Sequence, residues 1–405
     1  MKILHTADWH LGKKLHKHDL YEDFDLFVNW LHDLIKQKKI SLLLVSGDVF
    51  DLANPSSGAR QQYYRTLMKL RDLDCTVIIT GGNHDSPDML NAPRELLKAL
   101  DVHVLGGLPA DLGECLIPIY SKQGELELIV AALPYLRDAD LRKNTEASSY
   151  EDRLEQMRAG IKTTFDQAAQ LSTELYPKVP ILAMAHLFTA GIETSASERD
   201  IQIGNQAAFS ASQFGDHFKY IALGHIHKPQ RVNAQVPTYY SGSPLPLSFS
   251  ERSDDKRVLL LDTAHSWTPE SIAVPSFRKL LKISGPLERL REKLDALQLH
   301  NGLDTLIEIE LKEAQYDAAK IIDLDDLVTG FIKPGYEIVK HRATFTKQQR
   351  NASQLYAEDT QLEDLEPKDV FQKRMDQHEY DPETEQEIIS AFDELLEIAK
   401  QENFA

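Results

Sequence analysis

Short apolar runs alternate with helical patterns along the first 275 or so residues of the chain. Five of the runs predict buried strands, because each is short and rich in apolar or β-branched residues. They cover residues 2–6, 42–46, 76–80, 181–185 and 220–223, and two later strands are expected at 238–241 and 257–262. This alternation is typical of a layered α/β fold in which helices cover a sheet.

Helical periodicity is clearest over residues 23–35, 60–73 and 150–175. In the first segment, apolar residues recur three and four positions apart, which places them on one face of a helix. The members of this face are Phe24, Phe27, Val28, Leu31, Leu34 and Ile35. The faces of the first two segments can pack in the core of their own domain or against a second copy of the chain, and both interpretations stay open.

A second pattern begins near Pro275. It predicts strands at residues 279–284, 305–312 and 336–342, and helices at 286–297 and 317–331. About 70 residues in this order are sufficient for a small α+β domain. We therefore expect a first domain over residues 1–275 and a second over 276–345.

Apolar periodicity weakens after residue 345, which predicts a linker over residues 346–361. Two amphipathic helices are expected within residues 362–405, the second of them with Pro382 at its first turn. Its apolar stripe is Ile388, Phe392, Leu395, Leu396 and Ala399. Two such helices have no core of their own, so they either fold back on the second domain or bind a partner protein.

Composition narrows the class of protein. Of the 405 residues 42% are hydrophobic, and no run approaches the roughly 18–20 apolar residues that cross a membrane. The first strand is predicted to begin at Lys2, so no secretory leader is expected. Cys75 and Cys115 are the only cysteines, too few for a disulfide framework. These features predict a cytoplasmic protein with reduced thiols.

The formal net charge of −18 argues at first against nucleic acid as a ligand, because phosphate binding draws mainly on lysine and arginine. The acidic residues are unevenly distributed, however. Residues 346–405 contain 16 acidic and 6 basic residues and carry −10, whereas the first 345 residues carry −8. Net charge therefore does not exclude DNA binding.

Residue types that bind metals follow each of the five predicted strands. Loops after the carboxyl ends of strands are where α/β folds collect ligands, so we expect these side chains to meet at one rim. The seven candidate ligands are Asp8, His10, Asp48, Asn83, His186, His225 and His227. Seven oxygen and imidazole donors can hold two divalent cations about 3.5–4 Å apart, an arrangement that hydrolyses phosphate esters.

Each residue type has a task in this hypothesis. Asp48 is the natural bridge, because one carboxylate can touch both cations, and imidazole ligands favour transition metals over magnesium. His84 is predicted to be catalytic, as a donor of a proton to the leaving oxygen. Asp51 and Asp85 are expected to accept the second N–H of ligating histidines.

The remaining histidines lack neighbouring ligand patterns and are expected to be ordinary surface or core residues. They are His5, His32, His103, His217, His265, His300, His341 and His378. His16 and His18 differ, because they lie in one loop with Lys13, Lys14 and Lys17. This loop is either simply solvated or in contact with phosphate beside the metals.

Longer strings around these residues resemble a known family. They are HTADWHLG at 5–12, SGDVFD at 46–51, GNHD at 82–85, YIALGHIH at 220–227 and YSGSPLPLSF at 240–249. These strings are similar to the calcineurin-like metallophosphoesterases and, within them, to the SbcD family. SbcD proteins are the nuclease subunits of bacterial SbcC–SbcD complexes and relatives of the nucleases that repair double-strand breaks.

The resemblance implies an α/β fold: a calcineurin-like β-sandwich flanked by helices, a small α+β capping domain that helps hold DNA, and a C-terminal helical pair. It implies two cation sites that share one carboxylate, with manganese preferred, magnesium as the other candidate, and His84 as the catalytic acid. The first site is Asp8, His10, Asp48 and His227, and the second is Asp48, Asn83, His186 and His225.

The implied function is cleavage of DNA in recombination, replication and repair. The activities are an ATP-dependent 3′→5′ exonuclease on double-strand ends and an endonuclease on hairpins and single strands. Implied partners are DNA, an SbcC-like coiled-coil ATPase bound through residues 362–405, and a second copy of the chain in a homodimer. No GxxxxGK[ST] loop occurs in the chain, so ATP would act only through that ATPase.

Two other functions fit part of the pattern. A small-molecule phosphodiesterase, such as a cyclic-nucleotide hydrolase, can use the same metal core, although a small substrate does not need the 130 residues after Pro275. A degenerate scaffold that only binds partners would tolerate the loss of ligands, whereas all seven are present.

Overall fold

The computed structural model describes residues 1–141, 150–194, 208–298 and 302–345, and later in the chain residues 371, 375, 384, 386, 388–392 and 396. The chain forms two compact units, residues 1–311 with 320–342 and residues 312–319 with 343–405. The predicted linker 346–361, most of the predicted helical pair, His300 and His378 lie outside the described residues. The described residues from 371 to 396 are helical.

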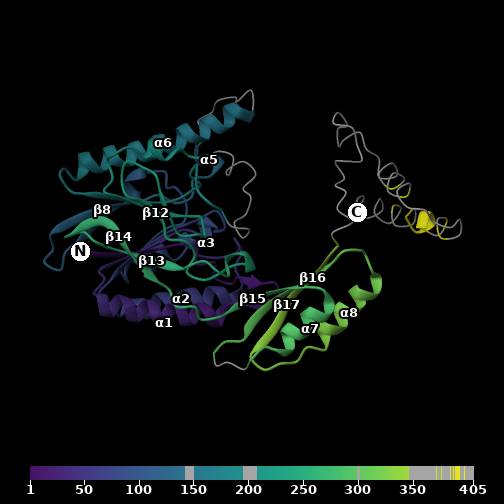
Figure 1. Cartoon of the computed structure of the whole chain (residues 1–405). Coiled ribbons are helices and arrows are strands. Elements are labelled where there is room, and N and C mark those ends of the chain that lie inside the picture. Colours follow the sequence, from purple (N-terminus) through teal and green to yellow (C-terminus); the bar gives the residue numbers. More distant parts are fainter. Residues whose placement is uncertain are drawn as a thin grey trace. The chain divides into compact units, whose positions relative to one another are not determined.

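Two six-stranded sheets form the centre of the first unit (Figure 1). The first has the order β14-β13-β1-β4-β5-β6, in which β1, β4, β5 and β6 are parallel and β13 and β14 form an antiparallel edge. Its strands are β1 (Lys2–Thr6), β4 (Leu42–Ser46), β5 (Thr76–Thr80), β6 (Val102–Leu105), β13 (Arg257–Asp262) and β14 (Ser266–Ala273).

The second sheet has the order β11-β12-β10-β9-β8-β7, with β8, β9, β10 and β12 parallel and β7 and β11 antiparallel at its edges. Its strands are β7 (Leu116–Tyr120), β8 (Leu126–Ala132), β9 (Ile181–His186), β10 (Tyr220–Gly224), β11 (Gln230–Val232) and β12 (Thr238–Tyr240). The β-sandwich that the family resemblance implied is thus present, whereas strand and helix alternation alone predicted one sheet.

Residues of one strand alternate between two cores, which explains why the strands are apolar throughout. In β4, Leu43 and Val45 face the helices outside the first sheet. Leu42 and Leu44 face the second sheet, where they meet residues such as Met184 of β9. All four β4 residues are fully buried. This packing fixes the two sheets face to face and brings their strand ends to a common rim.

Helices cover both outer faces of the sandwich (Figure 1). The six-residue apolar face predicted for residues 23–35 is buried in α1, so it belongs to the core of its own domain. The helices are α1 (Tyr21–Lys38) and α2 (Ser57–Arg71) on the first sheet, and α6 (Tyr150–Leu175) on the second. Shorter elements in the connections are β2 (Lys14–Leu15), β3 (His18–Asp19), α3 (Pro87–Asn91), α4 (Arg94–Lys98), α5 (Asp138–Leu141), η1 (Leu112–Cys115), η2 (Ala211–Phe214) and η3 (Phe249–Glu251).

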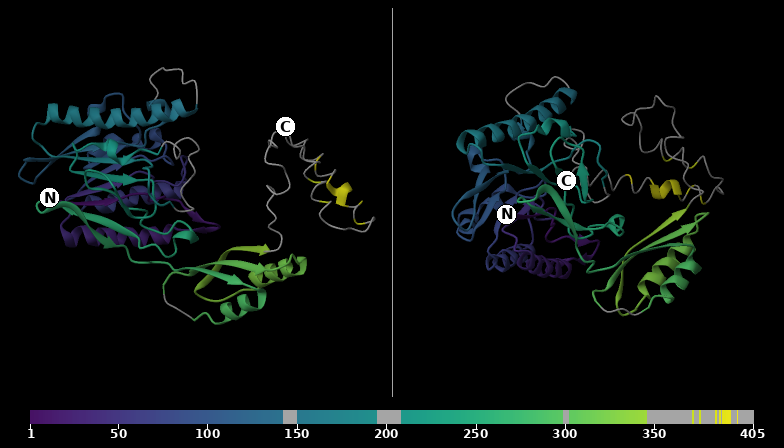
Figure 2. Two further views of the ribbon diagram at one scale, coloured as in Figure 1. Left: turned by 45° about the horizontal axis from the view of Figure 1, so that its top comes forward. Right: turned by 60° about the vertical axis from the view of Figure 1, so that its left-hand side comes forward.

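A three-stranded sheet follows the sandwich in the sequence, with its two helices on one face (Figures 1 and 2). Its elements are β15 (Leu280–Gly285), α7 (Leu287–Asp295), β16 (Thr305–Glu313), α8 (Ala318–Thr329) and β17 (Tyr336–Phe345), close to the predicted helices and strands. Arg278 precedes this sheet, and its Nε–H is shared between the two oxygens of the buried Asp23 carboxylate in α1, at 2.8 and 2.9 Å. This ion pair ties the start of the small sheet to the sandwich.

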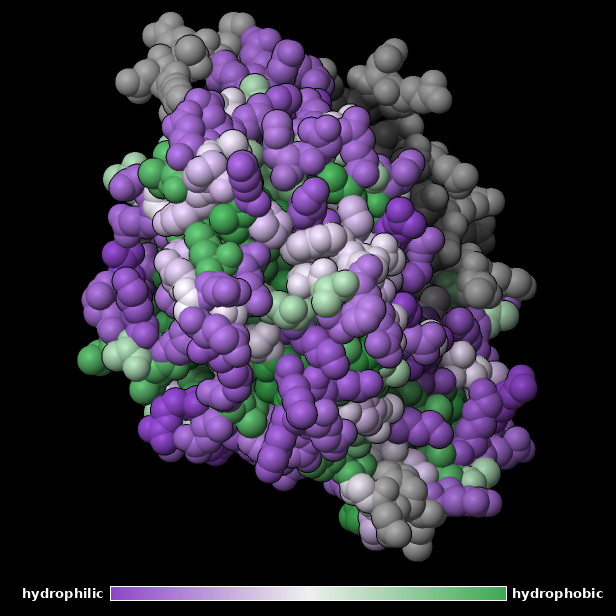
Figure 3. Space-filling model, turned by 90° about the vertical axis from the view of Figure 1, so that its left-hand side faces the viewer, coloured by the Kyte–Doolittle hydropathy of each residue, from purple (hydrophilic) through white to green (hydrophobic). Residues whose placement is uncertain are grey.

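The face of the molecule shown in Figure 3 is mostly hydrophilic, and its apolar side chains form small separate patches. None of the helices among the described residues is long and apolar enough to cross a membrane.

Candidate metal centre

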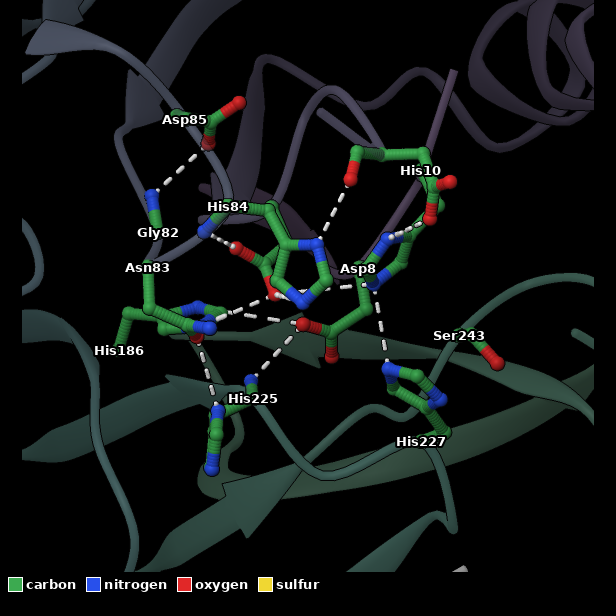
Figure 4. Close-up of polar contacts among 12 residues, drawn as sticks. Asp8, His10, Gly82, Asn83, His84, Asp85, His186, His225, His227 and Ser243 are labelled. Atoms are coloured by element: carbon green, nitrogen blue, oxygen red, sulfur yellow. Dashed lines mark hydrogen bonds and ion pairs between the residues drawn. The ribbon is translucent and has the colours of Figure 1, made fainter. Parts of the chain in front are cut away.

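The predicted site residues come from five strand ends, three in the first sheet and two in the second (Figure 4). Asp8 and His10 follow β1, Asp48 follows β4, Asn83 and His84 follow β5, His186 ends β9, and His225 and His227 follow β10. All except Asn83 are at least 96% buried. The sandwich therefore assembles the site from both sheets.

Four of these residues have a left-handed backbone, with φ of 53° at Asp8, 48° at His10, 48° at Asp48 and 102° at His225. Residues other than glycine rarely adopt such angles, and where they do the surrounding structure must hold them. Here the β1 loop hydrogen-bonds to the β4 loop. The Asp8 N–H donates to the Gly47 carbonyl at 3.1 Å, and the His10 N–H to the Asp48 carbonyl at 3.0 Å.

The Asp48 carboxylate lies at the centre of the site. Its Oδ2 is 3.6 Å from Nε2 of His10, 3.4 Å from Nε2 of His186 and 4.0 Å from Nε2 of His84. Its Oδ1 accepts a hydrogen bond of 2.9 Å from the His84 N–H. One carboxylate is thus reached by imidazoles from both sheets, as expected for a bridging ligand.

Two groups of ligand atoms adjoin Asp48. Within each group the atoms lie no more than 4.8 Å apart, and the groups are Asp8, His10 and His227 on one side and Asp48, His186 and His225 on the other. A third such group, His10, Asp48 and His84, joins Asp48 to the first side. Asn83 belongs with the second group, because its Oδ1 is 2.9 Å from Nε2 of His186 and 3.1 Å from Nδ1 of His225. The structure therefore brings all seven predicted ligands together.

The donor set fits divalent cations. Oδ2 of Asp8 and Nε2 of His225 are buried and have no hydrogen-bond partner among the described residues, although buried polar atoms are almost always paired. In addition, Nε2 of His10 and Nε2 of His227 lie 3.1 Å apart, two ring nitrogens aimed at each other. A cation would give Oδ2 of Asp8 and Nε2 of His225 a partner. Carboxylate, amide and imidazole donors suit manganese, iron or zinc.

Burial sets the electrostatics of the site. It raises the pKa of Asp8 to about 7, and the Asp48 charge acts in the same direction. Burial would also raise the pKa of Asp48, but the charges of His186 and His10 outweigh it and hold that pKa well below its usual value. Burial would lower the pKa of His186, but the Asp48 charge raises it to about 9. The carboxylates thus need a positive partner.

Asp51 and Asp85 were predicted to accept hydrogen bonds from ligand histidines, and only one of them does. Asp51 acts as expected, because its Oδ1 lies 3.2 Å from Nδ1 of His10 and also accepts from Lys13 at 3.0 Å. The prediction for Asp85 was wrong. Its carboxylate accepts three backbone N–H groups, those of Val49, Phe50 and Gly82, at 2.8–3.0 Å. Asp85 therefore fixes the β4 loop to the β5 loop instead of orienting an imidazole.

Sequence reasoning missed a buried ion pair behind His227. Oε1 of Glu251 is 3.5 Å from Nδ1 of His227, and Oε2 accepts from Lys256 at 2.5 Å. Lys256 also donates to the His227 carbonyl at 3.1 Å and to Ser243 at 2.8 Å. Burial would raise the pKa of Glu251, but its bond to His227 and the Lys256 charge lower it strongly. Glu251 thus stays ionised and orients His227.

Gly82 lets the β5 loop approach the bridging carboxylate. A Cβ at this position would lie 2.1 Å from Oδ1 of Asp48 and 2.3 Å from its backbone nitrogen. No side chain fits that space, so the glycine before Asn83 is a packing requirement of the site.

A cationic groove of about 560 Å³ lies beside the His10 side of the site. Its charged lining residues are Lys13, Lys14, Arg252, Lys282, Lys340, Arg342 and Glu308, and His16 and Phe249 stack in its wall. Lys340 is 3.2 Å from the buried Glu308, and Arg342 is 2.8 Å from the buried Glu310. Lys13 connects the groove to the metal centre through Asp51. Positive charge exceeds negative charge in this lining.

Comparisons with known proteins identify the family. Residues 1–229 match the calcineurin-like phosphoesterase family, and residues 276–379 match the family described as Type 5 capsule protein repressor C-terminal domain. The SbcD protein of Rhodobacter capsulatus, named as a subunit of the nuclease SbcCD, is 36% identical over 74% of this chain and 76% of its own length. The chain belongs to the SbcD family of calcineurin-like phosphoesterases.

Other SbcD proteins match over 98–100% of their length. The SbcD subunit of the SbcCD nuclease of Escherichia coli K12 is 28% identical over 98% of both chains, and that of Bacillus subtilis strain 168 is 29% identical over 100% of both. The predicted family is confirmed, and with it an enzyme of the metal-dependent hydrolase class. The histidine and aspartate groups of this SbcD-family chain are those expected to hold divalent metal.

Metal binding should stabilise the wild-type chain much more than a variant that lacks the Asp48 carboxylate. A ligand at 100 times its Kd stabilises the state that binds it by about 2.7 kcal/mol. We therefore expect Mn²⁺ to raise the Tm of EDTA-treated protein clearly, and Asp48→Ala to lose most of this shift. The control is Asp33→Ala, which removes a carboxylate that is 68% exposed. An equal Mn²⁺-dependent shift in Asp48→Ala would contradict the bridging role.

Proposed function

We propose that the chain is a nuclease that hydrolyses phosphodiester bonds of DNA with two divalent cations, manganese by preference. The observation that carries the proposal is the Asp48 carboxylate, reached by imidazoles on both sides. In this proposal the cations share Asp48. Asp8, His10 and His227 complete one site, and Asn83, His186 and His225 complete the other.

The chemistry is divided between the cations and the chain. When bound, the cations supply an activated water and neutralise charge on the phosphoryl oxygens. The chain positions the proton donor. Nδ1 of His84 donates to the Asp51 carbonyl at 2.8 Å, so the ring presents Nε2 towards Asp48 and the scissile phosphate. In the doubly protonated ring Nε2 also carries a proton, which passes to the leaving sugar oxygen and leaves the neutral ring with its hydrogen on Nδ1. The low exposure of His84, 4%, keeps bulk water from competing.

Replacing His84 should separate catalysis from metal binding. General acids contribute about 10²–10⁴-fold, so we expect His84→Gln to lower DNA cleavage by that factor while two metals per chain remain measurable. His265→Gln is the control, because that side chain is 81% exposed. Cleavage by His84→Gln at the wild-type rate would show that another group donates the proton.

DNA is favoured as substrate by the cationic groove beside the site. Its lysines and arginines come from the β2–β3 hairpin, the segment before β13 and the three-stranded sheet. Its six lysines and arginines can contact several phosphates of a strand, whereas a small ester offers one. Turnover on a hairpin oligonucleotide that exceeds turnover on cyclic nucleotides would favour the nuclease over a small-molecule phosphodiesterase.

Neutralising groove lysines should weaken DNA binding and its salt dependence. Each phosphate contact contributes about 0.9 to the slope of log K against log salt for duplex DNA. Lys14→Gln with Lys340→Gln should therefore reduce the slope by up to about 2. The control pair is Lys122→Gln with Lys219→Gln, both exposed and outside the groove. A slope equal to that of the control pair would exclude the groove as the DNA contact.

A coiled-coil ATPase of the SbcC type is proposed as the partner, with ATP acting only through it. The relatives are named as subunits of the SbcCD nuclease. Within the C-terminal segment, the rings of Phe371 and Phe392 stack with centroids 3.8 Å apart, which supports a pair of packed helices there. With this partner we propose ATP-dependent 3′→5′ exonuclease activity on double-strand ends and endonuclease activity on hairpins and single strands.

A homodimer of the chain in the cytoplasm, acting on nucleoid DNA, completes the proposal. Its support is apolar surface on neighbouring helices of the sandwich: Leu26 in α1 is 38% exposed, and Tyr64 and Met68 in α2 are 39% and 45% exposed.

Deleting residues 362–405 should remove the partner but not the basal chemistry, because all the site residues precede residue 228. We expect the truncated chain to retain metal-dependent cleavage of an end-labelled hairpin and to lose co-purification with the ATPase. ATP should then no longer stimulate cleavage of duplex ends. Undiminished co-purification would show that the ATPase binds elsewhere on the chain.

A further inference from the structure

Two aromatic side chains flank the metal-ligand histidines of the second sheet. The ring of Tyr135 meets that of His186 edge-on, with centroids 6.2 Å apart, and the ring of Phe188 meets that of His225 in the same way at 6.4 Å. Both aromatic residues are only partly buried. Neither has a role in binding metal, and neither follows from the ligand motifs.

The backbone holds both rings in place. The Tyr135 N–H donates to the Gly81 carbonyl at 2.8 Å, and the Arg137 guanidinium donates to the Asp85 carbonyl at 2.7 Å. The segment that carries Tyr135 is thus attached to the loop that carries Asn83. Phe188 lies two residues after the end of β9, and its carbonyl accepts from the Phe209 N–H at 3.0 Å. Rings fixed in this way can bind a ligand without first becoming ordered.

The space between the rings decides what kind of ligand fits. Tyr135, Phe188, His186 and His225 line one pocket of about 30 Å³, which has room for about one water molecule. A planar group therefore does not enter the pocket. It can lie against the partly exposed rings at the rim.

The surroundings of the metal centre are thus of two kinds. The cationic groove lies on the His10 side, because Asp51 contacts both His10 and the groove residue Lys13. Next to His186 and His225 lies the aromatic pair. A nucleotide strand carries both complementary features, a row of phosphates and flat bases. With a phosphate at Asp48, the neighbouring phosphates suit the groove and one neighbouring base suits the aromatic pair.

We propose that Tyr135 and Phe188 form a subsite for the unstacked nucleobase of a nucleotide next to the scissile phosphate. This inference rests on the nuclease function proposed above and adds a specificity element to it. Base–aromatic stacking tolerates every base, since each has a π-face, so the subsite does not select sequence. It selects for a base that is neither stacked on its neighbours nor paired with a complementary base.

The test uses the full-length chain with Mn²⁺ and single-stranded oligonucleotides of one sequence. In each oligonucleotide one position within two nucleotides of the cleaved bond is made abasic. We expect one abasic position to lower kcat/KM about tenfold, an effect of the size that loss of one stacked base produces, and to weaken binding by metal-free protein in the same proportion. Abasic sites elsewhere should have little effect.

A double variant and a control variant test whether the two rings cause the lower cleavage of the abasic oligonucleotide. Tyr135→Leu with Phe188→Leu keeps apolar bulk and removes both π-faces, so this variant should cleave intact and abasic oligonucleotides equally, while its metal content stays at two per chain. Tyr120→Leu is the control, because Tyr120 is 56% exposed at the end of β7, outside the pocket.

The outcomes separate this inference from the nuclease proposal. If the wild-type chain cleaves every abasic oligonucleotide as well as the intact one, the base subsite is rejected and the nuclease function stands. If the double-leucine variant keeps the wild-type discrimination, the subsite lies elsewhere and the inference is rejected. If the metal-loaded wild-type chain cleaves no oligonucleotide at all, the nuclease proposal itself is rejected.

Discussion

The burial of two carboxylates among imidazoles is the constraint on which the rest of the structure depends. Asp8 and Asp48 are at least 99% buried, and a buried charge requires a compensating charge or a full set of hydrogen bonds. The chain supplies part of this through histidines and backbone N–H groups, and it leaves Oδ2 of Asp8 without a partner among the described residues. Bound cations would complete the compensation.

The sandwich and the small sheet serve this site in different ways. Both large sheets contribute ligands, so the apolar contacts between the sheets also set the distances between those ligands. The loops are then connected to one another by Asp85 and by the backbone bonds that hold Asp8 and His10 in left-handed conformations. The three-stranded sheet adds lysines and arginines to the groove and contributes no ligand.

The strands and the convergence of the candidate ligands were predictable because their signals are local. Each ligand follows directly on an apolar run, and parallel strands of one layered fold end at the same rim. The second sheet was not predictable from alternation, since β7, β8 and β14 carry no distinct motif and sheet membership depends on contacts between distant segments. Resemblance to a known family supplied it.

Residues that act through other residues were the least predictable. Asp85 was assigned to an imidazole because it lies next to candidate ligands, but its carboxylate accepts from three backbone N–H groups instead. Glu251 and Lys256 lie more than 20 residues from His227 and meet it only in the folded chain. Tyr135 and Phe188 belong to ordinary apolar stretches, and only their position beside His186 and His225 gives them a role.

Anomalous X-ray diffraction from crystals of the chain grown with Mn²⁺ tests the central claim most directly. The account predicts two manganese peaks about 3.5–4 Å apart, with one oxygen of Asp48 bound to both. A single peak, or two peaks that do not share Asp48, would contradict it.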